Sequence, residues 1–232
     1  MLNLQDYYTA LDALVPGTIP LGEPEKLIAI NNALRLHSKY KPLRVTEDVP
    51  GDGGFDYPVA TAFASWDDEF STILQVEYPV DDTVVESSYL EDEDWILYEK
   101  PSGKVLRFLS EKPLATETFR VTYTVPHNFD EITDAGTVAA SDDIAVQKLA
   151  ASFFCRQLAA AYAQDQDSTI QADSVDHASK RREYEAQAQK YRGEYDELMG
   201  IQKGVRPASY NQDQDVVYPG GIDRLTHPRR NR

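Results

Sequence analysis

The fold is decided by residues 144–163, which read IAVQKLAASFFCRQLAAAYA. A helix drawn through this stretch is apolar on most of its faces, and a helix of that kind is buried by neighbouring elements. Just before it, Ser141-Asp142-Asp143 offers a capping residue and acidic first-turn residues, so the helix should begin there. Its many alanines allow other helices to approach closely. We therefore expect this helix at the centre of the protein.

A second long helix is predicted at about Asp173–Met199, after the polar segment Gln164–Ala172. A helix of about 26 residues spans roughly 39 Å. Apolar and aromatic side chains recur along it at steps of four, three, four and three residues: Tyr184, Ala188, Tyr191, Tyr195 and Leu198. This is the spacing of a contact between two helices, and tyrosines on a partly polar helix suit a subunit interface. We therefore expect this stripe to contact another subunit.

Two helices are predicted near the N-terminus. The first covers Leu4–Leu14 and ends at Val15-Pro16-Gly17, because proline cannot continue a helix. The second begins at Glu23-Pro24-Glu25, where proline suits the first turn, and continues to about Lys39. One buried stripe is expected along it: Leu27, Ile30, Leu34 and His37.

Between Leu43 and Val125 the hydrophobic period changes from helical to two. Four segments are rich in β-branched and aromatic residues: Ser71–Val80, Trp95–Lys100, Lys104–Leu109 and Thr118–Val125. Pro101-Ser102-Gly103 is typical of a hairpin turn between the middle two. In the last segment Phe119, Val121, Tyr123 and Val125 share one face. These patterns predict one small antiparallel sheet of four or more strands.

The resulting order predicts an α+β protein. Its N- and C-terminal helices form a helical bundle, with an inserted small antiparallel β-sheet module and an extended C-terminal tail. The corresponding boundaries are residues 1–42 and 127–200 for the bundle helices, 43–126 for the β module and 201–232 for the tail. A hydrophobic content of 41% over 232 residues is enough for a real core.

Charge is unevenly distributed. The net charge of −16 argues against broad nucleic-acid affinity, because phosphate binding depends on clustered Lys and Arg. Between Val45 and Trp95 there are fifteen acids and no Lys or Arg, so a strongly negative surface is expected, carried by Asp67, Asp68, Glu69, Glu91, Asp92, Glu93 and Asp94. This surface could serve solubility, or it could let DNA slide past without sticking. Cation binding at 91–94 is disfavoured, because the calcium-loop glycine is absent.

The tail from Ile201 to Arg232 has the opposite charge. It holds six basic residues and three acids, a net +3, which leaves −19 for the rest of the chain. Simple disorder is one interpretation, but the apolar content of the tail exceeds what a solvating tail needs. We expect it to order on a partner. The candidate docking residues are Val205, Arg206, Tyr210, Val216, Val217, Tyr218, Ile222, Arg224, Leu225, Arg229 and Arg230.

The sequence carries no recognisable enzyme motif. Gly51-Asp52-Gly53-Gly54 lacks the lysine and the following helix of a phosphate-binding loop, and the four histidines are far apart in sequence. The single cysteine, Cys155, lies in the central apolar stretch, excludes an internal disulfide framework and fits a reducing compartment. No apolar stretch reaches the roughly 18 residues of a membrane span. We expect no catalytic residues, no cofactor, no metal and no membrane partner.

The last helix resembles a known pattern. Residues 170–180, IQADSVDHASK, continuing through Glu183-Tyr184, Ala188, Tyr191 and Tyr195, are similar to the C-terminal helix of head–tail connector proteins of tailed bacteriophages, also called adaptor or head-completion proteins. Ile28–Lys39, followed by Pro42-Leu43, adds support. The β module departs from the mostly helical core of that family.

The resemblance implies a structural virion protein of the phage neck, made in the host cytoplasm. In that family subunits form a dodecameric ring beneath the portal, extend the DNA channel and offer a platform to the next neck, stopper or tail protein. The C-terminal segment docks onto the portal, which would give the tail a partner. DNA passes through the channel without specific binding.

Other functions remain open from the sequence alone. The chain could be another neck or tail-completion protein. The β module could be a ligand- or carbohydrate-binding module that uses Trp66, Tyr89 and Trp95, or the acidic run could belong to a divalent-metal enzyme.

Overall fold

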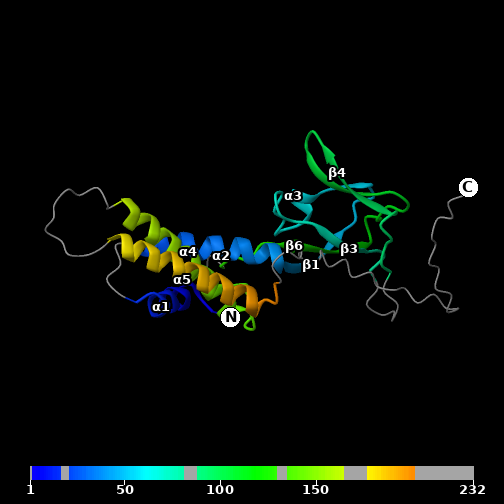
Figure 1. The fold of residues 1–232 in the computed structure, drawn as a ribbon. Coiled ribbons are helices and arrows are strands. Elements are labelled where there is room, and N and C mark those ends of the chain that lie inside the picture. Colours follow the sequence, from blue (N-terminus) through cyan, green and yellow to red (C-terminus); the bar gives the residue numbers. More distant parts are fainter. Residues whose placement is uncertain (1, 17–20, 81–87, 130–134, 165–176, 202–232) are drawn as a thin grey trace, which may run out of the picture.

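The computed structural model describes residues 2–16, 21–80, 88–129, 135–164 and 177–201. They form an elongated molecule with a bundle of helices at one end and a β unit at the other (Figure 1). The β unit is inserted between the N-terminal and C-terminal helices of the bundle, so the expected α+β architecture is confirmed.

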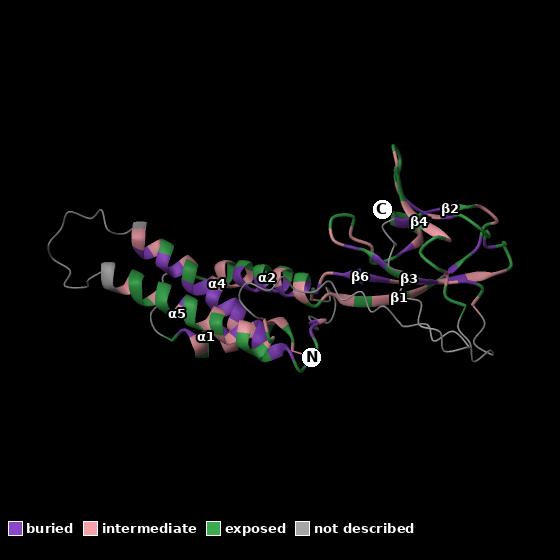
Figure 2. Cartoon of the chain, turned by 45° about the vertical axis from the view of Figure 1, so that its right-hand side comes forward, coloured by how far each residue is buried: buried purple, intermediate pink, exposed green. Residues whose placement is uncertain are grey.

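The bundle consists of α1 (Leu4–Leu14), α2 (Glu23–Tyr40), α4 (Asp143–Gln164) and α5 (His177–Leu198). As predicted, α4 is central: it packs against α2, α5 and α1. Its side chains Leu149, Phe154 and Leu158 are fully buried. Figure 2 shows buried residues along α4 where the other helices cover it.

Local signals fix where the N-terminal helices begin. The side chain of Asn3 accepts a hydrogen bond from the Asp6 N–H, and Asp6 accepts one in return from the Asn3 N–H. This reciprocal pair satisfies two N–H groups that α1 leaves without helical partners. At the start of α2, Pro24 occupies the first turn and Glu25 accepts a hydrogen bond from the Gly22 N–H.

The β unit contains two three-stranded antiparallel sheets, not the single sheet that the sequence predicted. One has the order β1 (Leu43–Pro50), β6 (Thr118–Val125), β3 (Ile73–Glu77). The other has the order β2 (Asp56–Pro58), β5 (Gly103–Phe108), β4 (Trp95–Lys100). The sheets separate because β5 and β6 do not pair with each other: β5 lies between β2 and β4, whereas β6 lies between β1 and β3. A single helical turn, α3 (Val59–Ala62), follows β2.

Gly51 allows the segments between the two sheets to approach closely. Its N–H donates to the Glu117 carbonyl at 2.8 Å. A Cβ atom at this position would lie 2.2 Å from the carbonyl oxygen of Leu114, so any side chain would push the two backbones apart.

The inner faces of the two sheets form the core of the β unit. Phe119, Val121 and Tyr123 of β6 are fully buried, as the alternation predicted. Rings from the other sheet meet them edge to face, with 4.6 Å between the centroids of Tyr57 and Phe119 and 5.1 Å between those of Phe108 and Phe119. The bundle and the β unit therefore each have an apolar core of their own.

Candidate functional site

The proposed docking residues of the tail lie outside the described residues, all eleven of them between Val205 and Arg230. The described chain ends just after α5. Gly200 has a positive φ of 66°, and the Gly200 and Ile201 N–H groups donate back to carbonyls of the last helical turn. Met199 and Ile201 pack against the core of the bundle.

The tyrosine stripe of α5 faces the chain's own bundle. Ala188 and Tyr195 are buried, and the Ala188 carbonyl accepts a hydrogen bond from Ser152 on α4 at 2.8 Å. The hydroxyl of Tyr191 donates to the Leu14 carbonyl on α1 at 2.6 Å. Because α4 is apolar all round, it needs cover on the side that α2 leaves open, and α5 supplies it.

This arrangement corrects the expected inter-subunit face. The residues proposed for it were Tyr184, Ala188, Tyr191, Tyr195 and Leu198. Ala188 and Tyr195 are used within the chain, and Tyr184 stacks on Tyr162 with 5.5 Å between ring centroids. Leu198 differs from the rest, since 57% of its surface is exposed.

The acidic residues proposed from the sequence all lie in the β unit. Asp67 and Asp94 are half-buried, whereas the other five are exposed: Asp68, Glu69, Glu91, Asp92 and Glu93. Two of the seven bind nearby side chains of the same unit. Asp68 accepts a hydrogen bond from the Trp66 indole at 2.8 Å, and Asp94 accepts one from Ser110 at 2.6 Å.

No group of three or more His, Cys, Asp or Glu within the described ranges is arranged to hold a metal ion.

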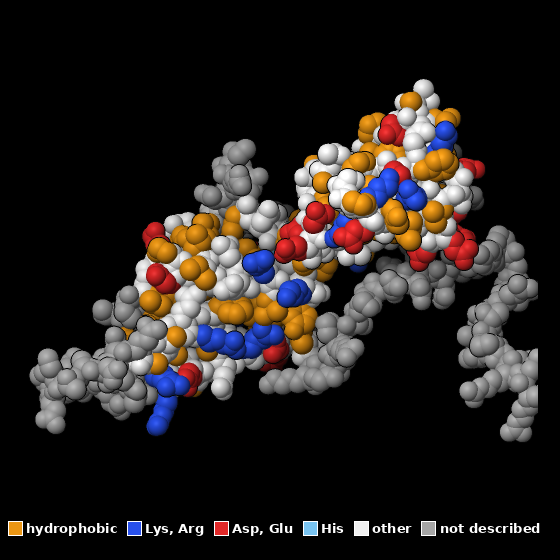
Figure 3. All heavy atoms as spheres, turned by 90° about the horizontal axis from the view of Figure 1, so that it is seen from above, with side chains coloured by type: hydrophobic (Ala, Val, Ile, Leu, Met, Phe, Trp, Pro, Cys, Tyr) orange, Lys and Arg blue, Asp and Glu red, His pale blue; other side chains and the backbone are white. Residues whose placement is uncertain are grey.

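A second surface of the β unit was not found from the sequence. It is the outer face of the sheet β2-β5-β4, and we call it the outer patch, consisting of Asp56, Ile96, Tyr98, Lys100, Arg107 and Leu109. Ile96, Tyr98 and Leu109 are 46%, 43% and 51% exposed. In Figure 3, Lys and Arg side chains on the β unit lie among hydrophobic and acidic ones.

Ion pairs organise the charged part of the outer patch. Asp56 accepts hydrogen bonds from Arg107 Nε at 2.6 Å and from Lys100 Nζ at 2.5 Å. These two cations, Arg107 first, hold the pKa of Asp56 well below its usual range. The Arg107 guanidinium also lies over the ring of Tyr98, 4.7 Å from its centroid.

One sequence signal could have revealed this patch. In Trp95–Lys100 both faces of the strand are apolar, with Trp95 and Leu97 on one and Ile96 and Tyr98 on the other. The sheet buries only one of those faces.

A buried polar cluster joins the bundle to the β unit. The histidines are far apart in the sequence, so a site built from them was not predicted. In the structure the ring centroids of His37 and His127 nevertheless lie 5.2 Å apart. The Ser38 hydroxyl accepts a hydrogen bond from the backbone N–H of His127 at 2.8 Å. On the His127 ring, Nε2 lies 2.9 Å from the Lys41 carbonyl oxygen. These bonds fix the segment after β6 against the C-terminal end of α2.

His37 is the most constrained member of this cluster. Its side chain is fully buried, with Nδ1 3.3 Å from the Tyr195 hydroxyl and Nε2 3.8 Å from a carboxylate oxygen of Asp142. Asp142 in turn pairs with Lys41 at 2.6 Å. Burial lowers the pKa of His37 to about 4, with the neighbouring His127 adding to the effect and Asp142 opposing it. A fully buried imidazole of this kind is part of the junction between the bundle and the β unit and is closed to a substrate.

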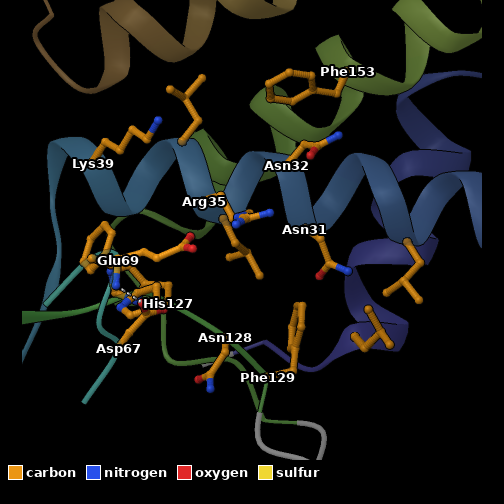
Figure 4. Close-up of a pocket in the computed structure, with 16 residues that line it drawn as sticks. Asn31, Asn32, Arg35, Lys39, Asp67, Glu69, His127, Asn128, Phe129 and Phe153 are labelled. Atoms are coloured by element: carbon orange, nitrogen blue, oxygen red, sulfur yellow. Dashed lines mark hydrogen bonds between the residues drawn. The ribbon is translucent and has the colours of Figure 1, made fainter. Parts of the chain in front are cut away.

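An open hollow of about 1260 Å³ lies beside this junction. Arg35 and Lys39 of α2 contribute to its lining, as do Asp67 and Glu69 of the β unit. Figure 4 shows Asp67, Glu69 and His127 close together below α2. The residues described around the hollow include no Ser, Thr, Cys or Tyr that could act as a nucleophile. It is an open notch between the two parts of the molecule, lined by both apolar and charged side chains.

The aromatic residues considered for ligand binding are mostly engaged. Trp66 packs against Phe63 and Tyr123, with centroids 5.8 and 5.7 Å away, and Trp95 packs against the core of the β unit. Tyr89 is 48% exposed. Of these three rings Tyr89 is the exposed one, whereas Trp66 and Trp95 are half-buried.

Cys155 is fully buried in α4, and burial raises its pKa to about 12, which disfavours the reactive thiolate. Within the described part of the chain, no helix combines the length and apolarity needed to cross a bilayer.

The comparisons with known proteins gave no match, either to a protein-family model or to a curated protein.

Proposed function

We propose that this protein is a structural component of a tailed-phage virion. It acts as an adaptor, with copies forming a ring that joins the portal to the tail or neck and extends the DNA channel. A dodecameric ring and a further neck or tail protein on the far side follow from the sequence resemblance. The proposed function depends on the shape of the protein and on its contacts, and it needs no catalytic group.

The observation that carries this proposal is that the bundle is closed at Ile201. Met199 and Ile201 pack against the core at the end of α5, and Ala188, Tyr191 and Tyr195 of the stripe contact α4, α1 and α2 of the same chain. Residues 202–232 nevertheless continue with a basic and partly apolar sequence. The proposal assigns this segment to the portal, where a short docking segment gains order from its partner.

The charge of the β unit supports passage of DNA without binding. Its exposed acids, among them Glu69, Glu91, Asp92 and Glu93, raise the local electrostatic potential against phosphate. Non-specific DNA binding depends on releasing counterions with Lys and Arg, and fifteen acids without a basic residue between Val45 and Trp95 work against it.

The test is co-sedimentation with portal rings of the full chain and of a chain ending at Ile201. We expect the truncated chain to keep the helical signal and melting temperature of the full chain and to lose attachment to the rings. A chain with residues 202–232 in scrambled order is the matched control for length and charge, and it should also fail to attach. Full attachment of the truncated chain would refute the proposed role of the tail.

A further inference from the structure

We propose that the outer patch is the contact surface for a second copy of this chain, and that it binds the acidic surface of that copy. The inference rests on the proposed ring assembly and names the surface through which neighbouring copies meet. The acidic surface consists of the exposed acids of the β unit, Asp68, Glu69, Glu91, Asp92 and Glu93.

The outer faces of the two sheets differ in chemistry. On the sheet β1-β6-β3 the outer face of the paired strands β1 and β6 is polar: the hydroxyls of Thr46 and Thr122 lie 3.1 Å apart, and Arg120 Nε pairs with Asp48 at 2.6 Å. Leu74 of β3 is exposed at 43%, but among the described residues it stands apart from a cation pair like that of Lys100 and Arg107. On the sheet β2-β5-β4 the corresponding face exposes Ile96 and Tyr98. Both sheets already bury their inner faces in one core, so this exposed apolar area contributes nothing to folding. Exposed apolar groups that lie together mark interaction surfaces.

The composition of the outer patch is that of an interface centre. Tyrosine and arginine are enriched there because each combines a large contact area with hydrogen-bonding capacity. Tyr98 and Arg107 already contact each other, and Asp56 holds Arg107 and Lys100 in place. These side chains therefore lose little further freedom on binding. With two cations and one carboxylate, the charged group is net positive.

Charge complementarity indicates that the partner of the outer patch is a second copy of this chain. Residues 45–94 hold fifteen acids and no Lys or Arg, whereas residues 95–113 hold four basic residues and two acids. One chain therefore carries both a strongly negative surface and a positive, partly apolar one. At a net charge of −16 two copies repel each other unless a positive surface meets a negative one.

The geometry of such a contact is head to tail. The outer patch and the acidic surface consist of different residues, and the proposed contact is the one in which each copy presents its patch to one neighbour and its acids to the other. A contact between unlike surfaces forms a ring when its rotation closes. This is the symmetry that an adaptor ring requires.

The test is sedimentation velocity of the full chain at low salt, from micromolar to millimolar concentration. We expect reversible association that weakens as salt rises, because the charges at the rim of the contact are screened. Ile96→Ser should raise the dissociation constant at least about tenfold, as is typical for a side chain at an interface centre. Ile28→Ser is the matched control, because Ile28 on α2 is similarly exposed at 53% and should have no effect.

Charge reversal tests the choice of occupant. The double variant Lys100→Glu, Arg107→Glu and the double variant Asp92→Lys, Glu93→Lys should each lose self-association, and an equimolar mixture of the two should regain it. Each variant is first compared with wild type by circular dichroism. A chain that stays monomeric at millimolar concentration, equal behaviour of the two serine variants, or no recovery in the mixture would overturn the inference.

Failure of this inference is separable from failure of the proposed function. Sedimentation of the chain involves no portal, and the portal assay compares chains that share the same outer patch. A chain that self-associates through the patch but ignores portal rings refutes the adaptor role and leaves the contact surface standing. Portal binding by a chain whose patch variants associate like wild type supports the adaptor role and refutes the contact surface.

Discussion

The buried His37 should make the protein less stable as pH falls from 7 to 5. Its pKa is lowered from 6.5 to about 4 in the folded state, because the ring is fully buried and lies beside His127. Between these two values the unfolded chain binds a proton that the folded chain does not, so acid favours unfolding. The penalty begins as pH falls through 6.5 and reaches its full size below about pH 4.

The magnitude follows from the two pKa values. At about 1.4 kcal/mol per pKa unit, the full penalty is about 3 kcal/mol, and the part lost between pH 7 and pH 5 is about 2 kcal/mol. Asp142 contributes outside this window. Burial works against its ionisation, but hydrogen bonds from Lys41 and Ser141 prevail and lower its pKa from 3.8, so its stabilising effect is lost only at more acidic pH.

Urea unfolding at several pH values between 7 and 5, on wild type and on His37→Gln, measures this effect. The glutamine variant loses packing and is less stable at pH 7, but its free energy of unfolding should fall by about 2 kcal/mol less than that of wild type between pH 7 and pH 5. The titrating groups that are not in contact with His37 are shared by both proteins and cancel in the difference. Identical slopes would show that His37 is not buried as a neutral ring.

Two substitutions and one thiol-labelling experiment test other parts of the structure. Gly51→Ala should destabilise the protein by roughly 2 kcal/mol or more in thermal or urea unfolding, because its Cβ would meet the Leu114 carbonyl at 2.2 Å, and an unchanged stability would contradict that close approach. Gly193→Ala should instead stabilise by about 0.5–1 kcal/mol, since the site is exposed within α5 and has open space around it. At pH 8 Cys155 should react with a thiol reagent only as fast as the bundle opens; immediate reaction in native buffer would mean that the thiol is accessible.

The parts of the fold that local periodicity controls could be predicted. The all-round apolar pattern around Phe154 placed α4 at the centre, and the alternation from Phe119 to Val125 assigned the buried face of β6. Pro24 marked the start of α2. Each of these signals acts within a few residues, and the pattern of one segment is enough to identify it.

The division into two sheets could not be predicted in the same way. β2 is three residues long, and it exists because Asp56 and Tyr57 pair with Arg107 and Leu106 of β5. β1 mixes Thr46 and two acids into its pattern and is held by pairing along its full length with β6. Strand pairing between segments so far apart in the chain leaves no periodic trace in either segment alone. The contact between His37 and His127 was missed for the same reason.

Hydrophobic periodicity also could not predict whether an apolar helix stripe is covered by the same chain or by another subunit. The spacing of Ala188 and Tyr195 correctly indicated helix contacts, but the partners belong to the same chain: Ala188 contacts α4, and Tyr195 contacts His37 and Tyr40 of α2. The sequence signal for an apolar stripe is the same in both cases. The two cases differ in whether the same chain contains another apolar helix that still needs a partner. Here α4 is that helix, because α2 leaves part of its apolar surface uncovered and α5 packs against it.

Because the described helices cover most of one another's apolar surface, the candidate contact between copies lies on the β unit. Once α5 covers α4, the described helices offer few large apolar side chains to a neighbour, such as Ile28, Ile144 and Leu198, and these belong to three different helices. The outer patch instead gathers Ile96 and Tyr98 on one strand next to two cations. The chain as a whole has a net charge of −16, so a positive apolar surface of this kind is complementary to the exposed acids of the β unit. The uneven charge seen in the sequence therefore has a physical consequence: copies repel in most orientations and attract in few, and the proposed contact is one of those few.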